Sequence, residues 1–424
     1  MELKELVEKQ YKSIIEKEGV KAFRQKAFDN FVKDGIPTSK HEEWKYADFT
    51  KVLKSDFSLL NSELNEADIK PFLFDAWDGN LVVVVNGNFS AKLSKIVSPE
   101  SEVKIKNFSD AKDSLTDKIN QFADAKNNPF SSLSAALATS GVYVEVPANK
   151  VVGKPILILN ICDKRANAIL AQPRNFISIG TTAQVKIVEA FYSLGSLDSF
   201  TNAYTEIYAG KDSVSELYKL QLEDSAASLV DTTQVFQAGK STFTCTTITL
   251  SGNMVRNNLN LVLNGEYCEG NMNGLYMLKG NTLVDNHTSV DHAMPNSLSN
   301  EMYKGILDDK STGVFNGKIF VRKDAQKTNA YQSNKNLLLS DDATINTKPQ
   351  LEIWANDVKC SHGATTGKLD KDMLFYLRAR GISEKSAKAI LMNAFAHDVL
   401  DTISLNSVKE YLNKIITERL GLDF

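Results

Sequence analysis

The segment Thr242–Leu263, TFTCTTITLSGNMVRNNLNLVL, contains two short strand patterns joined by a turn. Its β-branched residues favour extended structure, and the Ser-Gly-Asn sequence in the middle is typical of turns. From Asn258 to Leu261, asparagine alternates with leucine. Successive side chains of a strand point to opposite faces, so this alternation predicts a strand with one buried apolar face and one solvated face of amides.

Similar strand patterns recur over much of the chain. They begin with Leu81–Val85, which ends in the turn signal Asn86-Gly87. Many short strands without helices between them leave a sandwich, a propeller or a parallel β-helix, and the region is too long for one ordinary sandwich. We therefore predict a mainly β protein with a parallel β-helix core. The other strand patterns, separated by Gly, Asn, Asp or Ser, are 142–146, 155–161, 176–179, 185–190, 203–208, 215–222, 234–237, 242–250, 258–263 and 275–278.

Helical spacing is found mainly at the two ends of the chain. Apolar residues recur at three- and four-residue intervals from Leu3 to Val32 and again from Leu369 to Leu420. A helical or loop insertion is expected near 110–138, where the strand patterns are interrupted. The predicted domains are an N-terminal helical domain over 1–75, the β-helix core over 76–357 and a C-terminal helical domain over 358–424.

The composition is that of a folded, soluble protein. Of the 424 residues, 42% are hydrophobic and 24% are charged, which provides enough apolar material for a core. The net charge of −3 argues against a protein that binds nucleic acid or anionic membranes by neutralising their charge. The N-terminus lacks the apolar region of a signal peptide and no apolar run reaches the length of a membrane span, so we expect a cytoplasmic protein.

Motifs of the common enzyme classes are absent from the sequence. The stretch Gly313–Lys318 comes nearest to a phosphate-binding loop, but it lacks the required spacing, and Ile319 follows where a serine or threonine would hold magnesium. We find no GxSxG, GxGxxG or HExxH motif. We therefore expect a chain that binds no nucleotide and is not itself an enzyme.

A first group of possible metal ligands lies near residue 290. His287 and His292, flanked by Asp285 and Asp291, supply the nitrogen and oxygen atoms that a metal site could use. In a strand-turn-strand segment, however, such polar residues more often lie on a solvated wall or bond to the backbone. We favour this second interpretation.

A second group is formed by Cys360 and His362. These two residues, spaced two apart on an extended segment, project from the same face and together could hold iron. The structural alternative is a small buried thiol beside a hydrogen-bonded histidine. Because two ligands cannot complete a tetrahedral site, the functional hypothesis requires ligands from elsewhere or from another chain. The remaining cysteines, Cys162, Cys245 and Cys268, are far apart and form no CxxC pair.

Several segments of the C-terminal half closely resemble the SufB/SufD family of iron-sulfur cluster assembly proteins. They are AQKTNAYQ at 325–332, NLLLS at 336–340, KPQLEI at 348–353 and VKCSHGAT at 358–365. The resemblance continues through LFYLRARGI at 374–382 and, more loosely, to EEWKY at 42–46. It implies a right-handed parallel β-helix core between N-terminal and C-terminal helical domains, in agreement with the three parts predicted above.

The resemblance also implies partners and a site. Family members of this kind pair with SufB through their β-helices and bind the ATPase SufC through the C-terminal helical domain. ATP-driven SufC dimerisation is thought to expose the shared interface. There His362 would meet a SufB cysteine as a ligand of a transient iron-sulfur cluster, with Cys360 either assisting or only packing. The expected SufC contact is Phe375, Tyr376, Arg378, Gly381 and Ile382, although Phe375 and Ile382 could equally pack within the domain.

Asn334 distinguishes the two branches of the family. SufB carries a cysteine in the segment equivalent to 331–338, whereas this chain has none there, which favours the SufD branch. Such a chain is expected to be a scaffold subunit, and in isolation it could form a homodimer. The alternatives are a SufB-like scaffold that assembles clusters alone and, from another class, a β-helix carbohydrate-active enzyme. The second of these should show a signal peptide and clustered acidic residues, and neither is evident.

Overall fold

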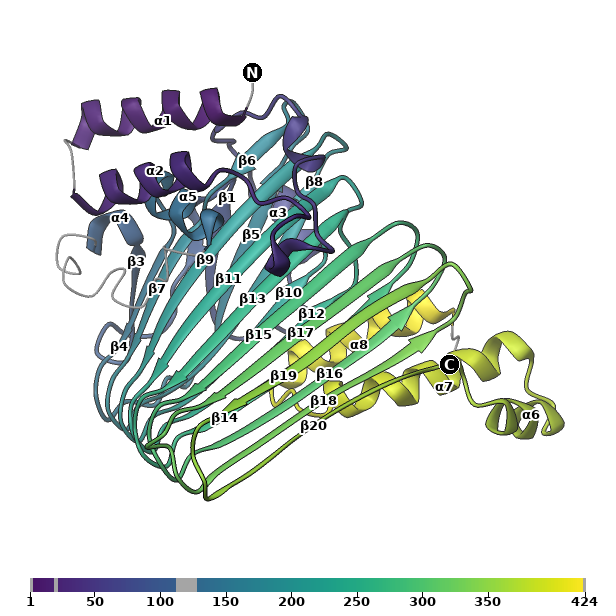
Figure 1. Ribbon diagram of the computed structural model, residues 1–424. Coiled ribbons are helices and arrows are strands. Elements are labelled where there is room, and N and C mark those ends of the chain that lie inside the picture. The colour runs from purple at the N-terminus through teal and green to yellow at the C-terminus, as the bar shows by residue number, and fades with distance from the viewer. Residues whose placement is uncertain (1–2, 19–21, 112–127, 422–424) are drawn as a thin grey trace.

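A parallel β-solenoid forms the body of the protein, with helices at both ends of the chain (Figure 1). The computed structural model describes residues 3–18, 22–111 and 128–421. Successive strands alternate between two sheets, so that each coil of the chain adds one strand to each sheet. The predicted β-helix fold with helices at both ends is thereby confirmed.

The two sheets face each other along the solenoid. The first sheet contains, in spatial order, β2 (Asn88–Lys95), β1 (Asn80–Val85), β5 (Ile156–Asp163), β8 (Gln184–Leu194), β10 (Val214–Gln221), β12 (Thr242–Thr249), β14 (Glu269–Leu278), β16 (Leu298–Leu307), β18 (Thr328–Leu338) and β20 (Val358–Gly367). The second contains β19 (Thr344–Ile353), β17 (Thr312–Val321), β15 (Leu283–His292), β13 (Met254–Leu263), β11 (Ala227–Gln237), β9 (Ser199–Ala209), β7 (Arg174–Ile179), β4 (Val142–Val146) and β3 (Lys104–Asn107), with β6 (Ile169–Ala171) beside β9.

Alternating side chains fill the space between the sheets. Leu259 and Leu261 point into this lumen and pack with Phe243, Phe315 and other apolar residues, whereas Asn258 and Asn260 face outward. The alternation read from Asn258 to Leu261 therefore has the predicted orientation. Side chains of neighbouring coils stack in register because the parallel pairing runs without a shift from β8 to β20.

Antiparallel strands and helices cover the N-terminal end of the solenoid. β2 pairs with β1 and β3 pairs with β4, both antiparallel, so these strands end the parallel stack. Beside them, α1 (Leu3–Glu18), α2 (Ala22–Asp34) and α5 (Pro129–Leu137) pack through buried residues such as Val7 and Phe130. The short helices α3 (Glu66–Ile69) and α4 (Phe108–Ala111) lie nearby. Of the insertion expected at 110–138, residues 112–127 lie outside the described chain and 129–137 form α5.

The C-terminal helices pack against the side of the solenoid. Buried residues of α7 (Glu384–Leu400) and α8 (Asn406–Leu420) share one apolar cluster with the outer face of the first sheet. The preceding helix α6 (Lys371–Ala379) extends away from the body and has no buried residue (Figure 1). Residues 358–367 form the last strand, β20, so helical structure begins at Lys371 and not at the expected boundary of 358, because the backbone there still pairs with β18. None of the described helices is long and apolar enough to span a membrane.

At the opposite end of the solenoid, none of the described strands covers the last coil. β20 is the last strand of the first sheet and β19 is the last of the second, and no described strand pairs with their outer edges. Every residue from Ser361 to Lys368 is exposed. Unpaired N–H and C=O groups therefore line this edge, which is a template for pairing with another chain.

Replacing Leu261 with alanine should destabilise the protein by about 2–5 kcal/mol, because the side chain is 1% exposed in the lumen and its removal leaves a cavity. Urea denaturation followed by circular dichroism measures the change. The matched variant Leu197→Ala removes the same atoms from a side chain that is 42% exposed and should cost much less. Equal losses in the two variants would contradict the lumen packing described above.

Candidate functional site

His362 and Cys360 lie on β20, at the uncovered end of the solenoid. In the register with β18, His362 pairs with Gln332 and Cys360 pairs with Ala330. Because Gln332 and Ala330 are buried and face the lumen, His362 and Cys360 lie on the lumen side of the last coil. The two side chains therefore lie on the same face, as predicted, and this face is at the end of the solenoid.

The two residues differ in their surroundings. Cys360 is half-buried and packs against an apolar cluster that includes Val321 and Ala330, and burial raises the pKa of its thiol. A raised pKa keeps the thiol protonated near neutral pH, which weakens it as a metal ligand. His362 is exposed, and its side chain makes no hydrogen bond to any described residue. Of the pair, the histidine is better placed to bind a ligand.

Within this chain the pair is not a complete metal site. Among the described residues no group of three or more His, Cys, Asp and Glu side chains converges to hold a metal ion. An imidazole and a thiol fill two positions of a tetrahedral iron site at most. The pair, which we call the half-site below, lies on the last strand of the first sheet, where no described strand follows.

Asn334, where a cysteine is expected in SufB, forms hydrogen bonds inside the lumen of this chain. Asn334 is fully buried in the lumen, where its amide donates to the hydroxyl of Tyr276 at 3.1 Å and to the carbonyl oxygen of Tyr303 at 3.3 Å. Its own oxygen accepts a hydrogen bond from Asn336 at 2.7 Å. Asn334 thus supports the coil below His362 and offers no thiol.

A buried carboxyl, Glu301, lies in the same region, and the sequence analysis did not single it out. Glu301 of β16 pairs in register with Gln332, whose Nε2 donates to Glu301 Oε2 at 2.6 Å. Burial raises the pKa of Glu301 to about 7, and hydrogen bonds from Thr288 and Gln332 offset only part of this effect. No motif marks Glu301, because its burial depends on the coil register alone.

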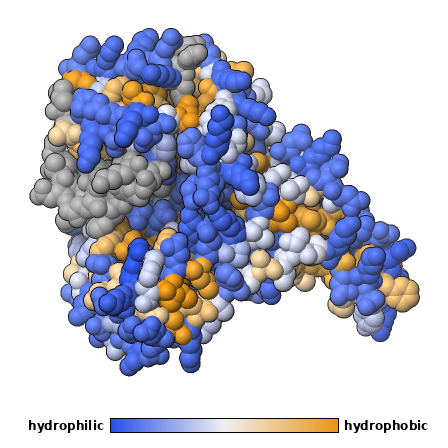
Figure 2. Space-filling model, viewed as in Figure 1, coloured by the Kyte–Doolittle hydropathy of each residue, from blue (hydrophilic) through white to orange (hydrophobic). Residues whose placement is uncertain are grey.

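The residues expected to contact SufC lie on and beside the projecting helix. Phe375 is 74% exposed and Tyr376 is 52% exposed, so Phe375 does not pack in the core of its own domain. Arg378 is exposed and pairs with Glu384 at 3.5 Å, while Ile382 is half-buried. Gly381 has a φ of +85° and ends the helix in the left-handed conformation that glycine adopts readily. Figure 2 shows apolar surface on this projecting part of the molecule.

The four residues near position 290 do not form a metal site. His292 points into the lumen, bonds to Ser299 Oγ at 2.9 Å, and burial lowers its pKa to about 4. Asp291 is on the outer face and pairs with Arg322 at 2.6 Å. His287 and Asp285 are also on the outer face and pair with each other at 3.0 Å. The favoured interpretation, a solvated wall or bonds to the backbone, fits the outer-face positions of His287 and Asp291. It is wrong for His292, which is buried in the lumen and bonds to a side chain, because the coil register turns this residue inward.

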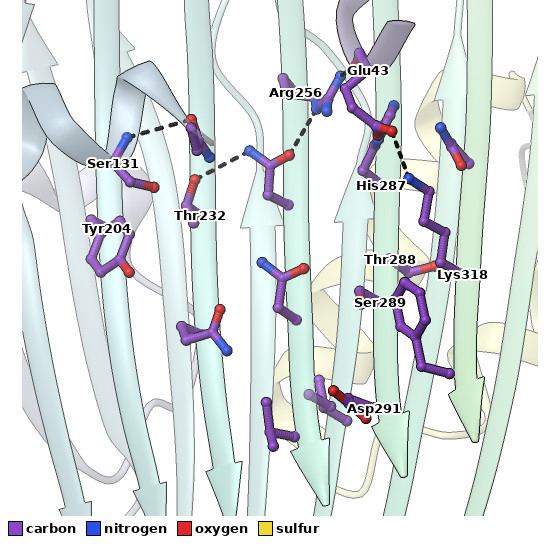
Figure 3. A pocket seen from close by; sticks show the side chains of 18 of the residues that line it. Glu43, Ser131, Tyr204, Thr232, Arg256, His287, Thr288, Ser289, Asp291 and Lys318 are labelled. Carbon is purple, nitrogen blue, oxygen red and sulfur yellow. Dashed lines mark hydrogen bonds and ion pairs between the residues drawn. The ribbon is translucent and has the colours of Figure 1, made fainter. Parts of the chain in front are cut away.

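A groove of 760 Å³ crosses the outer face of the second sheet (Figure 3). Glu43 covers part of it, forms an ion pair with Lys318 at 2.6 Å and lies 3.4 Å from His287 Nδ1. The other carboxylate of its lining, Asp291, is the one paired with Arg322. Glycoside hydrolysis needs a carboxylic acid and a carboxylate free to act on the sugar. With both carboxylates engaged by cations, the groove does not support the carbohydrate-active alternative.

Replacing Glu301 with glutamine should reduce the pH dependence of stability. Because the folded pKa is raised from 4.5 to about 7, the folded state retains a proton that the unfolded state has released. The retained proton stabilises the folded state. This stabilisation is complete below the pKa of the unfolded state and is lost as the pH rises through the pKa of the folded state, and it amounts to a total on the order of 3 kcal/mol. Urea denaturation at about pH 5 and about pH 8 should show a smaller loss of stability for Glu301→Gln than for the wild type. The exposed control Glu266→Gln should behave like the wild type, and a Glu301→Gln variant that did the same would contradict the prediction.

Comparison with known proteins agrees with these features. Residues 161–395 match the SufBD core domain of SUF system FeS cluster assembly, and residues 2–158 match the SufBD protein N-terminal region. The chain is 30% identical over 416 residues to the iron-sulfur cluster assembly protein SufD of Escherichia coli, covering 97% of this chain and 96% of that protein.

Two further relatives extend the comparison. An iron-sulfur cluster assembly SufBD family protein of Synechocystis, slr0076, is 31% identical over 409 residues, which cover 93% of this chain and 90% of the relative. The chloroplastic protein ABCI7 of Arabidopsis thaliana is 26% identical over 383 residues, or 88% of this chain and 80% of the relative. The parallel solenoid and these matches along nearly its whole length identify the chain as a member of the SufBD family of iron-sulfur cluster assembly proteins.

Proposed function

We propose that this chain is a SufD-type scaffold subunit that pairs with SufB through the open end of its solenoid and binds SufC through its C-terminal helices. A nascent iron-sulfur cluster is held at the SufB interface before transfer. The chain itself performs no catalysis, and nucleotide hydrolysis belongs to SufC. The observation that carries the proposal is the uncovered end of the solenoid, where the exposed edge strand β20 presents His362.

The difference between the two ends of the solenoid supports pairing at β20. Antiparallel strands terminate one end, whereas the strands at the other end expose unpaired backbone groups. Solenoids need capping elements at their ends to stay soluble, and an uncapped edge invites a strand from another chain. A second solenoid that docks here satisfies the backbone and extends the stack.

The half-site supports a shared cluster. Iron in these clusters takes thiolates, and imidazole can replace thiolate as a ligand. In this proposal His362 supplies the imidazole and SufB supplies thiolate. Cys360, with its raised thiol pKa and apolar contacts, acts in packing and positions β20.

The exposed aromatic residues of α6 support SufC binding. Exposed apolar side chains that lie together on one element often mark an interaction site, and aromatic residues are enriched among the residues that contribute most to binding. Met373 is 48% exposed, and it adds to the surface formed by Phe375 and Tyr376. The position of α6 also fits this role, because α6 has no buried residue and so loses little packing when it follows a partner that changes conformation.

The alternative of a SufB-like scaffold that works alone has less support. Asn334 is bonded on three sides within the lumen and has no thiol. The half-site therefore requires a thiolate from a different chain.

Replacing His362 with alanine should leave the complex with SufB and SufC intact but lower its bound iron and sulfide by roughly 10-fold or more, because a ligand is lost. Anaerobic co-purification with SufB and SufC followed by iron and sulfide analysis provides the measurement. Ser361→Ala changes the neighbouring side chain on the other face of β20 and serves as the control. Full cluster content in His362→Ala would exclude His362 as a ligand.

Replacing Phe375 with serine should weaken SufC binding by roughly 30-fold, the effect of losing a contact worth about 2 kcal/mol, while leaving the fold unchanged. Isothermal titration calorimetry with SufC measures the affinity. Val151→Ser removes an apolar side chain that is 59% exposed elsewhere on the solenoid and should not alter binding. Wild-type affinity in the Phe375→Ser variant would place the SufC contact elsewhere.

A further inference from the structure

Three polar side chains form a column at the open end of the lumen. Glu301 of β16, Gln332 of β18 and His362 of β20 are paired in register, each with the next. Strands of one sheet lie about 4.8 Å apart, so side chains that point the same way stack at this spacing. Only His362, at the end of the column, is exposed. The column therefore runs from two buried side chains in the lumen to the exposed histidine of the half-site.

The nitrogen end of the Gln332 amide lies on Glu301. Its Nε2 donates to Glu301 Oε2 at 2.6 Å. From the opposite sheet, Gly317 leaves room for the amide, since a Cβ atom at this glycine would lie 2.2 Å from Gln332 Nε2. With the nitrogen end of the amide bonded to Glu301, the oxygen end needs a different partner.

The oxygen end has no partner in the chain as described. Gln332 is 4% exposed, and its Oε1 is buried without a hydrogen bond to any described residue. A buried acceptor without a hydrogen bond costs about 1–3 kcal/mol. The His362 ring, next in the column, also lacks a partner among the described residues, and it has a donor to offer. Since His362 is exposed, its side chain is free to rotate toward the amide.

We infer that Gln332 is a positioning residue for the half-site: its Oε1 accepts a hydrogen bond from one ring N–H of His362 and so leaves the other ring nitrogen free to bind iron. The two ring nitrogens of a histidine are distinct, and the hydrogen bond at one decides which is protonated. Histidines that bind metals are commonly held this way by a second residue, whose loss costs about 10- to 100-fold in metal affinity. The inference rests on the proposed ligand role of His362.

The hydrogen bond can be tested without any cluster. Nuclear magnetic resonance of the full chain labelled with ¹⁵N in its histidine rings reports which nitrogen carries the proton, and His362→Ala identifies the signals of His362. In the wild type, at a pH where the ring is neutral, one tautomer of His362 should predominate. In Gln332→Met, which keeps the size of the side chain but cannot accept this bond, the two tautomers should approach the mixture found in an exposed histidine. Gln234→Met, a matched change on the outer face of the second sheet, should leave the His362 signals unchanged.

Two further variants separate positioning from folding. Glu301→Leu combined with Gln332→Met removes both buried polar groups, so that no carboxyl is left without its partner, and it should show the same loss of tautomer preference in a folded chain. Gln332→Glu retains an acceptor and should restore the preference at least in part. In the complex with SufB, Gln332→Met should lower bound iron by about 10-fold without weakening assembly.

The outcomes distinguish this inference from the function on which it rests. An unchanged His362 spectrum in both Gln332→Met and the double variant would overturn the positioning role, whatever the cluster content. A changed spectrum together with full cluster content in His362→Ala would retain the hydrogen bond and overturn the ligand role. A changed spectrum together with reduced iron in Gln332→Met supports both.

Discussion

Backbone pairing between successive coils, parallel and without a shift of register, is the constraint on which the rest of this structure depends. Because the register is maintained from β8 to β20, every inward position of one coil faces the corresponding position of the next. Apolar positions build a continuous core, and polar positions build continuous columns. The same pairing leaves an unsatisfied edge wherever the stack ends, so a solenoid must either terminate in a cover or join another chain.

The lumen shows how strictly the register places polar groups. The ammonium group of Lys219 lies 2.7 Å from Glu189 and 2.8 Å from Asp231, and all three side chains are buried. Such a charge is tolerated inside a protein only with partners in good geometry, because an isolated buried charge is very costly. Since each partner comes from a different strand, a slip of one residue would turn an entire strand inside out. These groups therefore favour one register over its neighbours.

The exposed parts of the molecule differ in kind from this ordered interior. β20 presents backbone and an imidazole at the end of a rigid stack, whereas α6 presents aromatic side chains on a helix that makes few contacts with the body. In the proposal above, the edge strand holds a cluster ligand at the end of the paired stack. The helix α6, which has no buried residue, is the part that follows the movement of a partner.

The sequence by itself determined the class of fold, the helical ends and the candidate pair Cys360 and His362. Strand alternation such as Asn258–Leu261 and the helical spacing at the two ends both reflect which side chains are buried away from water. Both patterns can therefore be read from the order of residues alone. The cysteine and histidine were visible because they are two residues apart. The tertiary structure alone decided that Cys360 packs in an apolar cluster, that β20 extends the core beyond residue 358, and that Phe375 is exposed. It also placed Glu301 and Gln332 beneath His362, since these residues are about thirty positions apart in sequence and meet only because one coil of the solenoid brings the chain back to the same face.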